Sequence, residues 1–368
     1  MKRSFSYYGD FSFTVPDIKG YMELLVPDNI IMLDKDGARS GRILKVLPSE
    51  SNGNSITVSG YHLDGLTCER INKPTDNDAI AVLNYGYDSV PQIVSDDQIK
   101  NGISPVSAET IVKTYVDRHM VSAEDPKRRF ELLRIEPDKH RGNLTVKSAS
   151  LGTVLADTLK EVCEDNNIGY QISADPLNKR MLFSVICQTD HSKNQYKNRQ
   201  IVFGKKYKNL SNASHTVSIE GYKNIGYGAG ETFENGLREM MAYGIDEEIA
   251  KGFDRHEVFV DCGSLSSAES DTSMSIKDEV LNNLKSNKKT NSLSGTVVPD
   301  GPFCYLRDFN LGDIVTVEMS DFGIEADLPI TEVEEIYEPQ NITITPTFGT
   351  PMDAGIRLMQ VIKTKGVR

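Results

Sequence analysis

The stretch SITVSGYHL, residues 55–63, alternates between apolar and polar side chains and indicates the fold class. Alternation over this length is typical of a β-strand with one buried face. Upstream, the apolar run at 29–33 is followed by Asp36-Gly37, a dipeptide that tolerates positive φ and often connects hairpins. The stretch GRILKVL at 41–47 then alternates with one interruption. Because hairpins succeed one another here without a helix, these residues predict a small antiparallel barrel or sandwich.

Helical periodicity begins after the first hundred residues. Apolar side chains recur at helical spacing over 109–117 and again from Leu151 to 163, and a capping box at Ser275 opens a third helix. We also expect a broken helix at 237–241 and a polar loop at 286–302. Strands return at 169–172, 181–186, 201–203, 216–220, 256–260, 313–318, 328–336 and 342–345.

The composition excludes several classes of protein. The 41 basic and 53 acidic side chains give a net charge of −12, which opposes nucleic-acid binding over a broad surface. No apolar run approaches the roughly 20 residues that span a bilayer, and residues 1–10 lack the apolar core of a secretory signal. The five cysteines are irregularly spaced without a CxxC pair, so we expect free thiols in a reducing compartment.

Several segments occur in a particular order. They are SITVSGYHLDGL (55–66) with Glu69-Arg70, the helix at 109–117, the helix from Leu151, IVFG (201–204), LGDIVTV (311–317), ITEV (330–333) and Phe348-Gly349. In this order and spacing they resemble the tail-hub family of siphophages, over about residues 11–351. That family is similar to the hub proteins of contractile phages and to the N-terminal part of type VI spike proteins. The resemblance implies a β-rich α+β chain with the phage tail-hub fold, in which an α+β domain is inserted between two tube-type small β-barrels.

This interpretation divides the chain into four parts. They are a first tube-type barrel at 1–104, an α+β excursion domain at 105–199 with 236–302, a second tube-type barrel at 200–235 with 303–351, and a basic tail at 352–368. The tail carries Arg357, Lys363, Lys365 and Arg368, and we expect it to be a docking end too short for an enzymatic module.

The resemblance also implies a function. The chain would be a structural, non-enzymatic tail-tip (baseplate hub) protein of a phage or prophage, forming a trimeric ring that continues the tail tube and links it to the distal tip. Its partners would be two further copies of itself, the distal tail ring protein, the tape-measure protein and a receptor-binding or spike component. It would bind no membrane and would meet nucleic acid only in transit. It would be assembled in the host bacterial cytoplasm and would lie at the virion tail tip.

Two alternatives remain open. Many tail-tip proteins carry cell-wall hydrolases, and the acidic clusters Glu164-Asp165, Asp246-Glu247-Glu248 and Glu334-Glu335 are candidates for such a site. A glycosidase needs two carboxylates about 5–10 Å apart across a cleft, whereas clusters of this kind usually lie on a solvated face. The other alternative is the hub of a contractile bacteriocin or injection machine, which the sequence does not separate from a phage tail.

No motif predicts a catalytic, cofactor-binding or metal-binding residue. The histidines lack zinc-ligand spacings; they are His62, His119, His140, His191, His215 and His256. Asp34-Lys35-Asp36-Gly37 resembles the start of a calcium loop, but no acid occupies the later ligand positions, so we interpret it as a hairpin turn. The glycine-rich stretch 226–230 lacks the features of a phosphate loop, so we expect a strand exit that needs positive φ or close backbone packing.

One stretch opposes the overall charge. Residues 179–208 contain eight basic side chains and a single acid, with the aromatic residues Tyr196, Phe203 and Tyr207 between them. Such a pattern suits contact with single-stranded nucleic acid, a solvated loop or a docking surface for an acidic neighbouring ring. The net charge of −12 disfavours the first of these.

Overall fold

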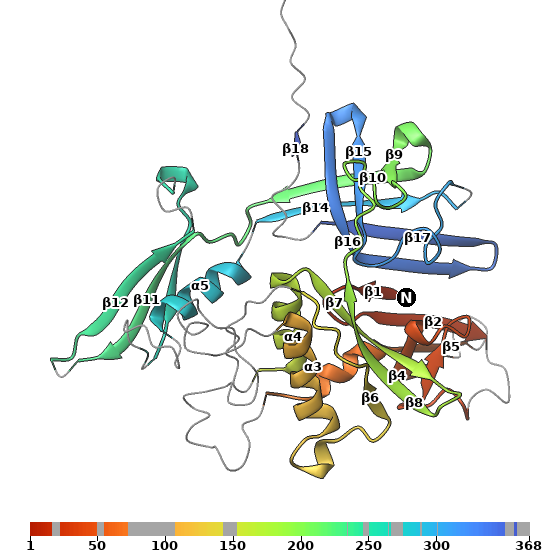
Figure 1. Cartoon of the computed structure of the whole chain (residues 1–368), viewed down its shortest axis with the longest axis horizontal. Coiled ribbons are helices and arrows are strands. Elements are labelled where there is room, and N and C mark those ends of the chain that lie inside the picture. Colours follow the sequence, from red (N-terminus) through yellow and green to blue (C-terminus); the bar gives the residue numbers. More distant parts are fainter. Residues whose placement is uncertain are drawn as a thin grey trace, which may run out of the picture.

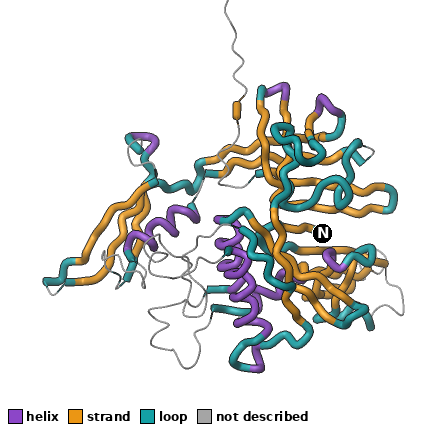
Figure 2. The backbone as a smooth tube through the Cα atoms, viewed as in Figure 1, coloured by secondary structure: helices purple, strands orange, loops and turns teal. Residues whose placement is uncertain are grey.

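The computed structural model describes residues 1–16, 23–49, 55–72, 107–142, 153–233, 235–245, 250–263, 265, 275–287, 289–299, 301–349 and 357–358. Strands predominate throughout this part of the chain (Figure 2). They form four sheets, and the larger ones are curled (Figure 1). Each of these larger sheets packs a cluster of buried apolar side chains. The predicted β-rich α+β class is therefore confirmed. None of the described helices is long and apolar enough to cross a membrane.

The first sheet contains the stretch that indicated the fold. Its strands, in order, are β2 (Asp10–Pro16), β5 (Ser55–His62), β4 (Ser40–Ser49) and β3 (Ile30–Met32). Alternate residues of β5 are buried, and Ile56 and Val58 pack with Phe11 and Ile43 in the core. The interrupted alternation in β4 is a β-bulge, because the register with β5 shifts by one residue at Leu44.

The second sheet has eight strands. Six run in the order β10 (Leu210–Ser218), β14 (Thr290–Val297), β17 (Asn341–Phe348), β16 (Ile324–Glu338), β15 (Ile314–Met319) and β9 (Val202–Gly204), while β1 (Lys2–Ser4) and β18 (Arg357–Leu358) pair with β16. Its core includes the fully buried rings of Phe203 and Phe348, with Phe309 close to full burial. The rest of the tail at 352–368 lies outside the described residues.

Two strands of this sheet differ from the sequence-based assignment. β1 lies within residues 1–104 but pairs with β16 of the second sheet. β14 occupies part of the expected polar loop at 286–302, within the range given to the α+β excursion, and pairs with β10 and β17. Leu293, Gly295 and Val297 are its buried residues. Their alternation with serine and threonine carries too few large apolar side chains to stand out in the sequence.

The α+β unit lies within 105–199, the first of the two segments assigned to the excursion domain, and none of the described strands of 236–302 joins its sheet. Its sheet contains β6 (Leu133–Ile135), β8 (Arg180–Cys187) and β7 (Ile168–Asp175), and the helices α3 (Ala108–Val116) and α4 (Leu155–Asp165) pack side by side on it (Figure 1). Both helices were predicted, although Leu151 lies outside the described residues. A short π-helix, Asp117–Val121, follows α3.

The satellite unit stands apart from the other sheets (Figure 1). It contains β12 (Arg238–Gly244), β11 (Ile225–Thr232), β13 (Glu257–Asp261) and α5 (Ile276–Ser286), and α5 covers one face of the sheet. The helix expected at 237–241 is wrong, because these residues form β12. Met and Ala are good helix formers, but intrinsic helix propensity is a small free-energy difference, and pairing with β11 overrides it.

The glycine-rich stretch 226–230 lies inside β11 and faces α5. A Cβ at Gly226 would collide with Val280, and a Cβ at Gly228 would collide with Ile276. The predicted close backbone packing is therefore confirmed, but within a strand and without positive φ.

A buried charge cluster fixes the start of α3. Glu109 is fully buried, and its carboxylate accepts hydrogen bonds from Lys113 Nζ at 2.6 Å and from Arg141 Nε at 2.7 Å. Burial alone would raise the pKa of Glu109, but the hydrogen bonds from Arg141 and Lys113 outweigh it and lower the pKa to about 2. The carboxylate is thus charged over the whole ordinary pH range.

We expect Glu109→Gln to destabilise the protein by about 3 kcal/mol at pH 7, because the buried ammonium of Lys113 loses its counter-charge. Because the pKa of Glu109 is lower in the folded protein than its ordinary value of 4.5, the charged carboxylate stabilises the fold at pH values above 4.5. This stabilisation is lost as the pH falls toward the pKa of about 2 in the folded protein. The difference between wild type and variant should therefore shrink from about pH 5 to about pH 3 in urea titrations followed by circular dichroism. A difference that stays constant with pH would contradict this assignment.

Candidate functional site

The turn between β3 and β4 contacts both the α+β unit and the second sheet. Asp36 caps the short 3₁₀ helix Gly37–Arg39, and its Oδ1 accepts the Ala38 N–H at 3.0 Å. A Cβ at Gly37 would collide with the carbonyl oxygen of Ala174 in β7. The interpretation as a hairpin turn is confirmed by the antiparallel pairing of β3 with β4.

Arg39 extends from this turn to the second sheet. Its side chain is 8% exposed, and Nη1 contacts Glu335 Oε2 at 3.1 Å and Tyr337 Oη at 2.8 Å. Nη2 contacts Asp34 Oδ2 at 3.0 Å, and Nε contacts Asp36 Oδ2 at 3.1 Å. The two carboxylates that suggested a calcium loop therefore bind a guanidinium of the same chain.

The first nine residues connect the same parts by backbone hydrogen bonds, and we call them the N-terminal seam. The N–H groups of Glu335 and Phe5 donate to Met1 O and Thr331 O, each at 2.8 Å. Phe5 O in turn accepts the N–H of Tyr170 in β7 at 3.2 Å. At the far end of the seam, Gly9 O accepts the His62 N–H of β5 at 2.9 Å. The seam thus joins the second sheet, the α+β unit and the first sheet.

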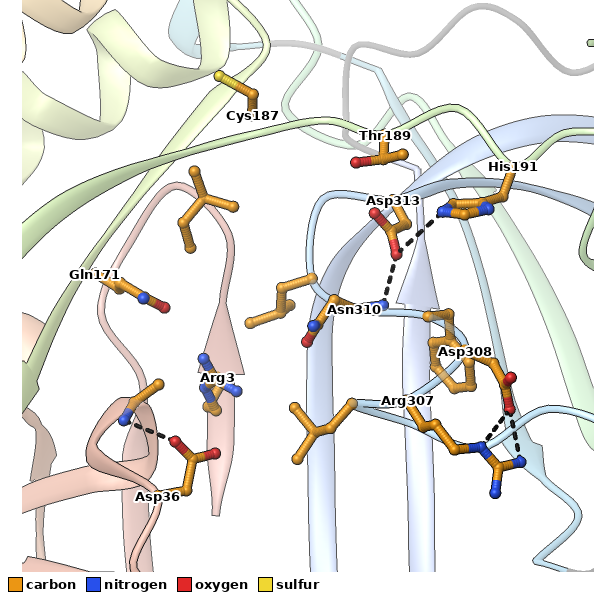
Figure 3. A pocket seen from close by; sticks show the side chains of 15 residues that line it. Arg3, Asp36, Gln171, Cys187, Thr189, His191, Arg307, Asp308, Asn310 and Asp313 are labelled. Carbon is orange, nitrogen blue, oxygen red and sulfur yellow. Dashed lines mark hydrogen bonds and ion pairs between the residues drawn. The ribbon is translucent and has the colours of Figure 1, made fainter. Parts of the chain in front are cut away.

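A cavity of about 630 Å³ opens beside the seam (Figure 3), and we call it the junction cavity. Its polar lining comes from all three parts of the chain. These residues are Arg3, Asp36, Gln171, Thr189, His191, Arg307, Asp308, Asn310 and Asp313.

The acidic groups of the junction cavity have distinct environments. Burial raises the pKa of Asp313, whose Oδ2 accepts the Asn310 N–H at 2.7 Å and lies 3.9 Å from His191 Nε2. The pKa of Asp308 is lowered, first by the backbone N–H of Cys304 and then by Arg307. The carboxylates of Asp36 and Asp308 form structural ion pairs with Arg39 and Arg307.

The acidic clusters named from the sequence lie in separate places. Glu164 and Asp165, at the end of α4, form ion pairs with Lys160 at 3.9 Å and with Lys285 at 3.3 Å. Glu335 is the buried partner of Arg39. The cluster at 246–248 lies outside the described residues.

The histidines also serve local roles. His62 is buried between Asp64 Oδ2 at 2.9 Å and Ala38 O at 2.8 Å, whereas burial lowers the pKa of His119 to about 4. In the described part of the chain no group of three or more His, Cys, Asp and Glu side chains could hold a metal ion. The five cysteines are free thiols.

Half of the basic side chains at 179–208 have acidic partners within the chain. Lys193 lies 2.5 Å from Glu325 and 3.6 Å from Glu318 of the second sheet. The other ion pairs are Arg180–Asp175, Arg199–Asp308 and Lys205–Asp321. This segment therefore pairs with acidic residues of its own chain, a role that the sequence hypotheses did not include. Contact with a partner stays a prediction.

Comparison with known proteins assigns a family. The model of the Siphovirus ReqiPepy6 Gp37-like proteins matches residues 1–350. The chain belongs to this family. The match confirms the relationship to siphophage proteins that the order of segments indicated. A search of curated protein sequences gives no significant match.

Several solved structures of phage tail proteins resemble this member of the family. The 43 kDa tail protein of prophage MuSo2 from Shewanella oneidensis is 13% identical, with 95% of this chain and 93% of that chain covered and a TM-score of 0.45. The tail protein from Neisseria meningitidis MC58 is 12% identical, with 94% and 89% covered and a TM-score of 0.46. The prophage tail protein gp18 from Listeria monocytogenes EGD-e is 12% identical, with 93% and 87% covered and a TM-score of 0.40. Likenesses at this level carry no functional argument.

We expect Arg39→Met to destabilise the protein by about 3–5 kcal/mol, because it leaves the buried carboxylate of Glu335 without a counter-charge. The matched control is Arg42→Met, which removes the ion pairs of a more exposed arginine with Asp28 and Glu69 and should cost about 1 kcal/mol or less. The double variant Arg39→Met with Glu335→Gln should recover part of the loss. Equal effects of Arg39→Met and Arg42→Met in guanidinium titrations would contradict the buried pairing.

Proposed function

We propose that the chain is a structural tail-tip (baseplate hub) protein of a phage or prophage, whose homotrimeric ring continues the tail tube and links it to the distal tip. The observation that supports this most directly is the joining of two curled β regions within one chain by the N-terminal seam and Arg39. A ring that continues a tube needs subunits whose surfaces keep a fixed orientation. The family match at 1–350 spans both β regions and agrees with this role.

For the domain organisation we propose the four parts predicted from the sequence, adjusted to the strand pairing and with the satellite unit separated from them as a fifth. β1 and β14 join the second β region, and β11 joins β12 and β13 in the satellite unit. The second region then combines residues 200–218 with 290–349 and borrows the first strand of the chain. This adjustment explains why the satellite unit can extend away from the body of the protein.

We further propose that the distal tail ring protein, the tape-measure protein and a receptor-binding or spike component are the partners of this ring. The net charge of −12 suits a channel that nucleic acid crosses without being held, since each basic contact with phosphate adds affinity. The particle would be assembled in the host bacterial cytoplasm, with this chain at the virion tail tip.

We propose a non-enzymatic role. Of the described members of the candidate clusters discussed above, Glu164, Asp165 and Glu335 are bound in ion pairs within the chain, and the remaining one, Glu334, lies exposed on β16. Peptidoglycan zymography with the full chain should therefore show no clearing, whereas clearing that survives purification to homogeneity would favour a tail-associated hydrolase.

A cryo-electron microscopy reconstruction of the tail tip tests the ring itself. We expect three copies of the chain in one ring, each placing two β regions around the channel, because two regions per subunit match a six-fold tube above. Six copies in the ring, or absence of the chain from purified particles, would contradict the proposal.

A further inference from the structure

Arg3 is a buried cation that has no acidic partner among the residues that the structure describes. The residue is 6% exposed, and in the described part of the chain its guanidinium has one hydrogen bond, from Nη1 to Tyr305 Oη at 3.2 Å. A guanidinium carries five N–H donors, and burial of a charge without a counter-ion is costly. Glu335 lies nearby across β1 and β16, but its Oε2 binds Arg39 and Tyr337.

Further polar side chains line the same space. Arg3 lines the junction cavity together with Gln171 of β7 and Asn310 of the second β region. Figure 3 shows these two side-chain amides on either side of Arg3. Neither amide has a hydrogen-bond partner in the described part of the chain, so both can donate to a molecule in the cavity.

The charges around Arg3 favour a singly charged ligand. Asp36, Asp308 and Asp313 also line the cavity, and they would repel a phosphate dianion more strongly than a carboxylate. A planar carboxylate also matches the fork of a guanidinium, which can donate two parallel N–H bonds to it.

We propose that the junction cavity binds a carboxylate, held by the guanidinium of Arg3 with the amides of Gln171 and Asn310 as additional donors. The carboxylate belongs either to a free small molecule or to an acidic side chain of a neighbouring protein. The proposal goes beyond the tail-tip role and does not depend on it, because every group that carries it lies in one chain.

Saturation-transfer difference NMR on the methyl group of acetate tests the proposal with the full chain. Wild type should give a saturable signal, and Arg3→Met should weaken the apparent affinity about tenfold or more. The matched control is Arg180→Met, which removes an exposed arginine paired with Asp175 outside the cavity and should leave the signal unchanged. Equal signals from wild type and Arg3→Met would overturn the site, as would displacement of acetate by inorganic phosphate at lower concentration than by formate.

A second variant covers the case in which Arg3→Met does not fold, which circular dichroism would reveal. Gln171→Met keeps the size of the side chain and removes the amide, so it should weaken acetate binding several-fold, and an unchanged affinity would overturn the proposal.

The peptides acetyl-Gly-Glu-Gly-amide and acetyl-Gly-Gln-Gly-amide distinguish the two sources of the carboxylate, a free small molecule and a protein side chain. If the glutamyl peptide binds more tightly than acetate, the site is assigned to a protein side chain. If the glutamyl peptide and acetate bind equally, the site is assigned to a free carboxylate. Equal binding of the two peptides would overturn the site.

Discussion

The guanidinium of Arg39 constrains the arrangement of the whole chain, because it is charged and its side chain is only 8% exposed. Its own turn supplies Asp34 and Asp36, and β16 supplies Glu335 and Tyr337. Removing one partner of a buried ion pair costs about 3–5 kcal/mol, which is a large part of the free energy of unfolding of an ordinary domain. The first and second sheets must therefore keep the relative position that brings Glu335 to Arg39.

The N-terminal seam reinforces this arrangement through close packing around Phe5. The Phe5 ring lies in the core of the second sheet, while its backbone pairs with Thr331 and Tyr170. A Cβ at Gly312, where φ is +86°, would collide with this ring, so the second β region approaches the seam more closely than any side chain would allow. Backbone from three parts of the chain thus meets around one aromatic ring, and the junction cavity forms beside it. A chain joined internally in this way would suit the proposed tail-tip ring, in which each subunit keeps its shape.

Within the described residues, local periodicity predicted most of the strands and the three α-helices α3, α4 and α5, because alternation and helical spacing are visible over short stretches such as 55–63 and 109–117. It missed β14, whose residues are mostly small and polar, and β12, whose residues prefer helix until β11 pairs with them. The junction between Arg39 and Glu335 could not be predicted, since the two residues are 296 positions apart. Its one local sign was the acidic turn at Asp34 and Asp36, which the sequence identified as a hairpin turn without indicating the guanidinium that it binds.

Native-state hydrogen exchange measures most directly whether the three parts form one cooperative unit. The amides of Phe5, Tyr170 and Glu335 donate across the seam, and Val58 lies inside the first sheet. If the seam and Arg39 join the parts as described, these amides should exchange with the same free energy as the most protected core amides, because they open only on global unfolding. Exchange of the three seam amides at a free energy several kcal/mol lower, while Val58 stays protected, would contradict the account.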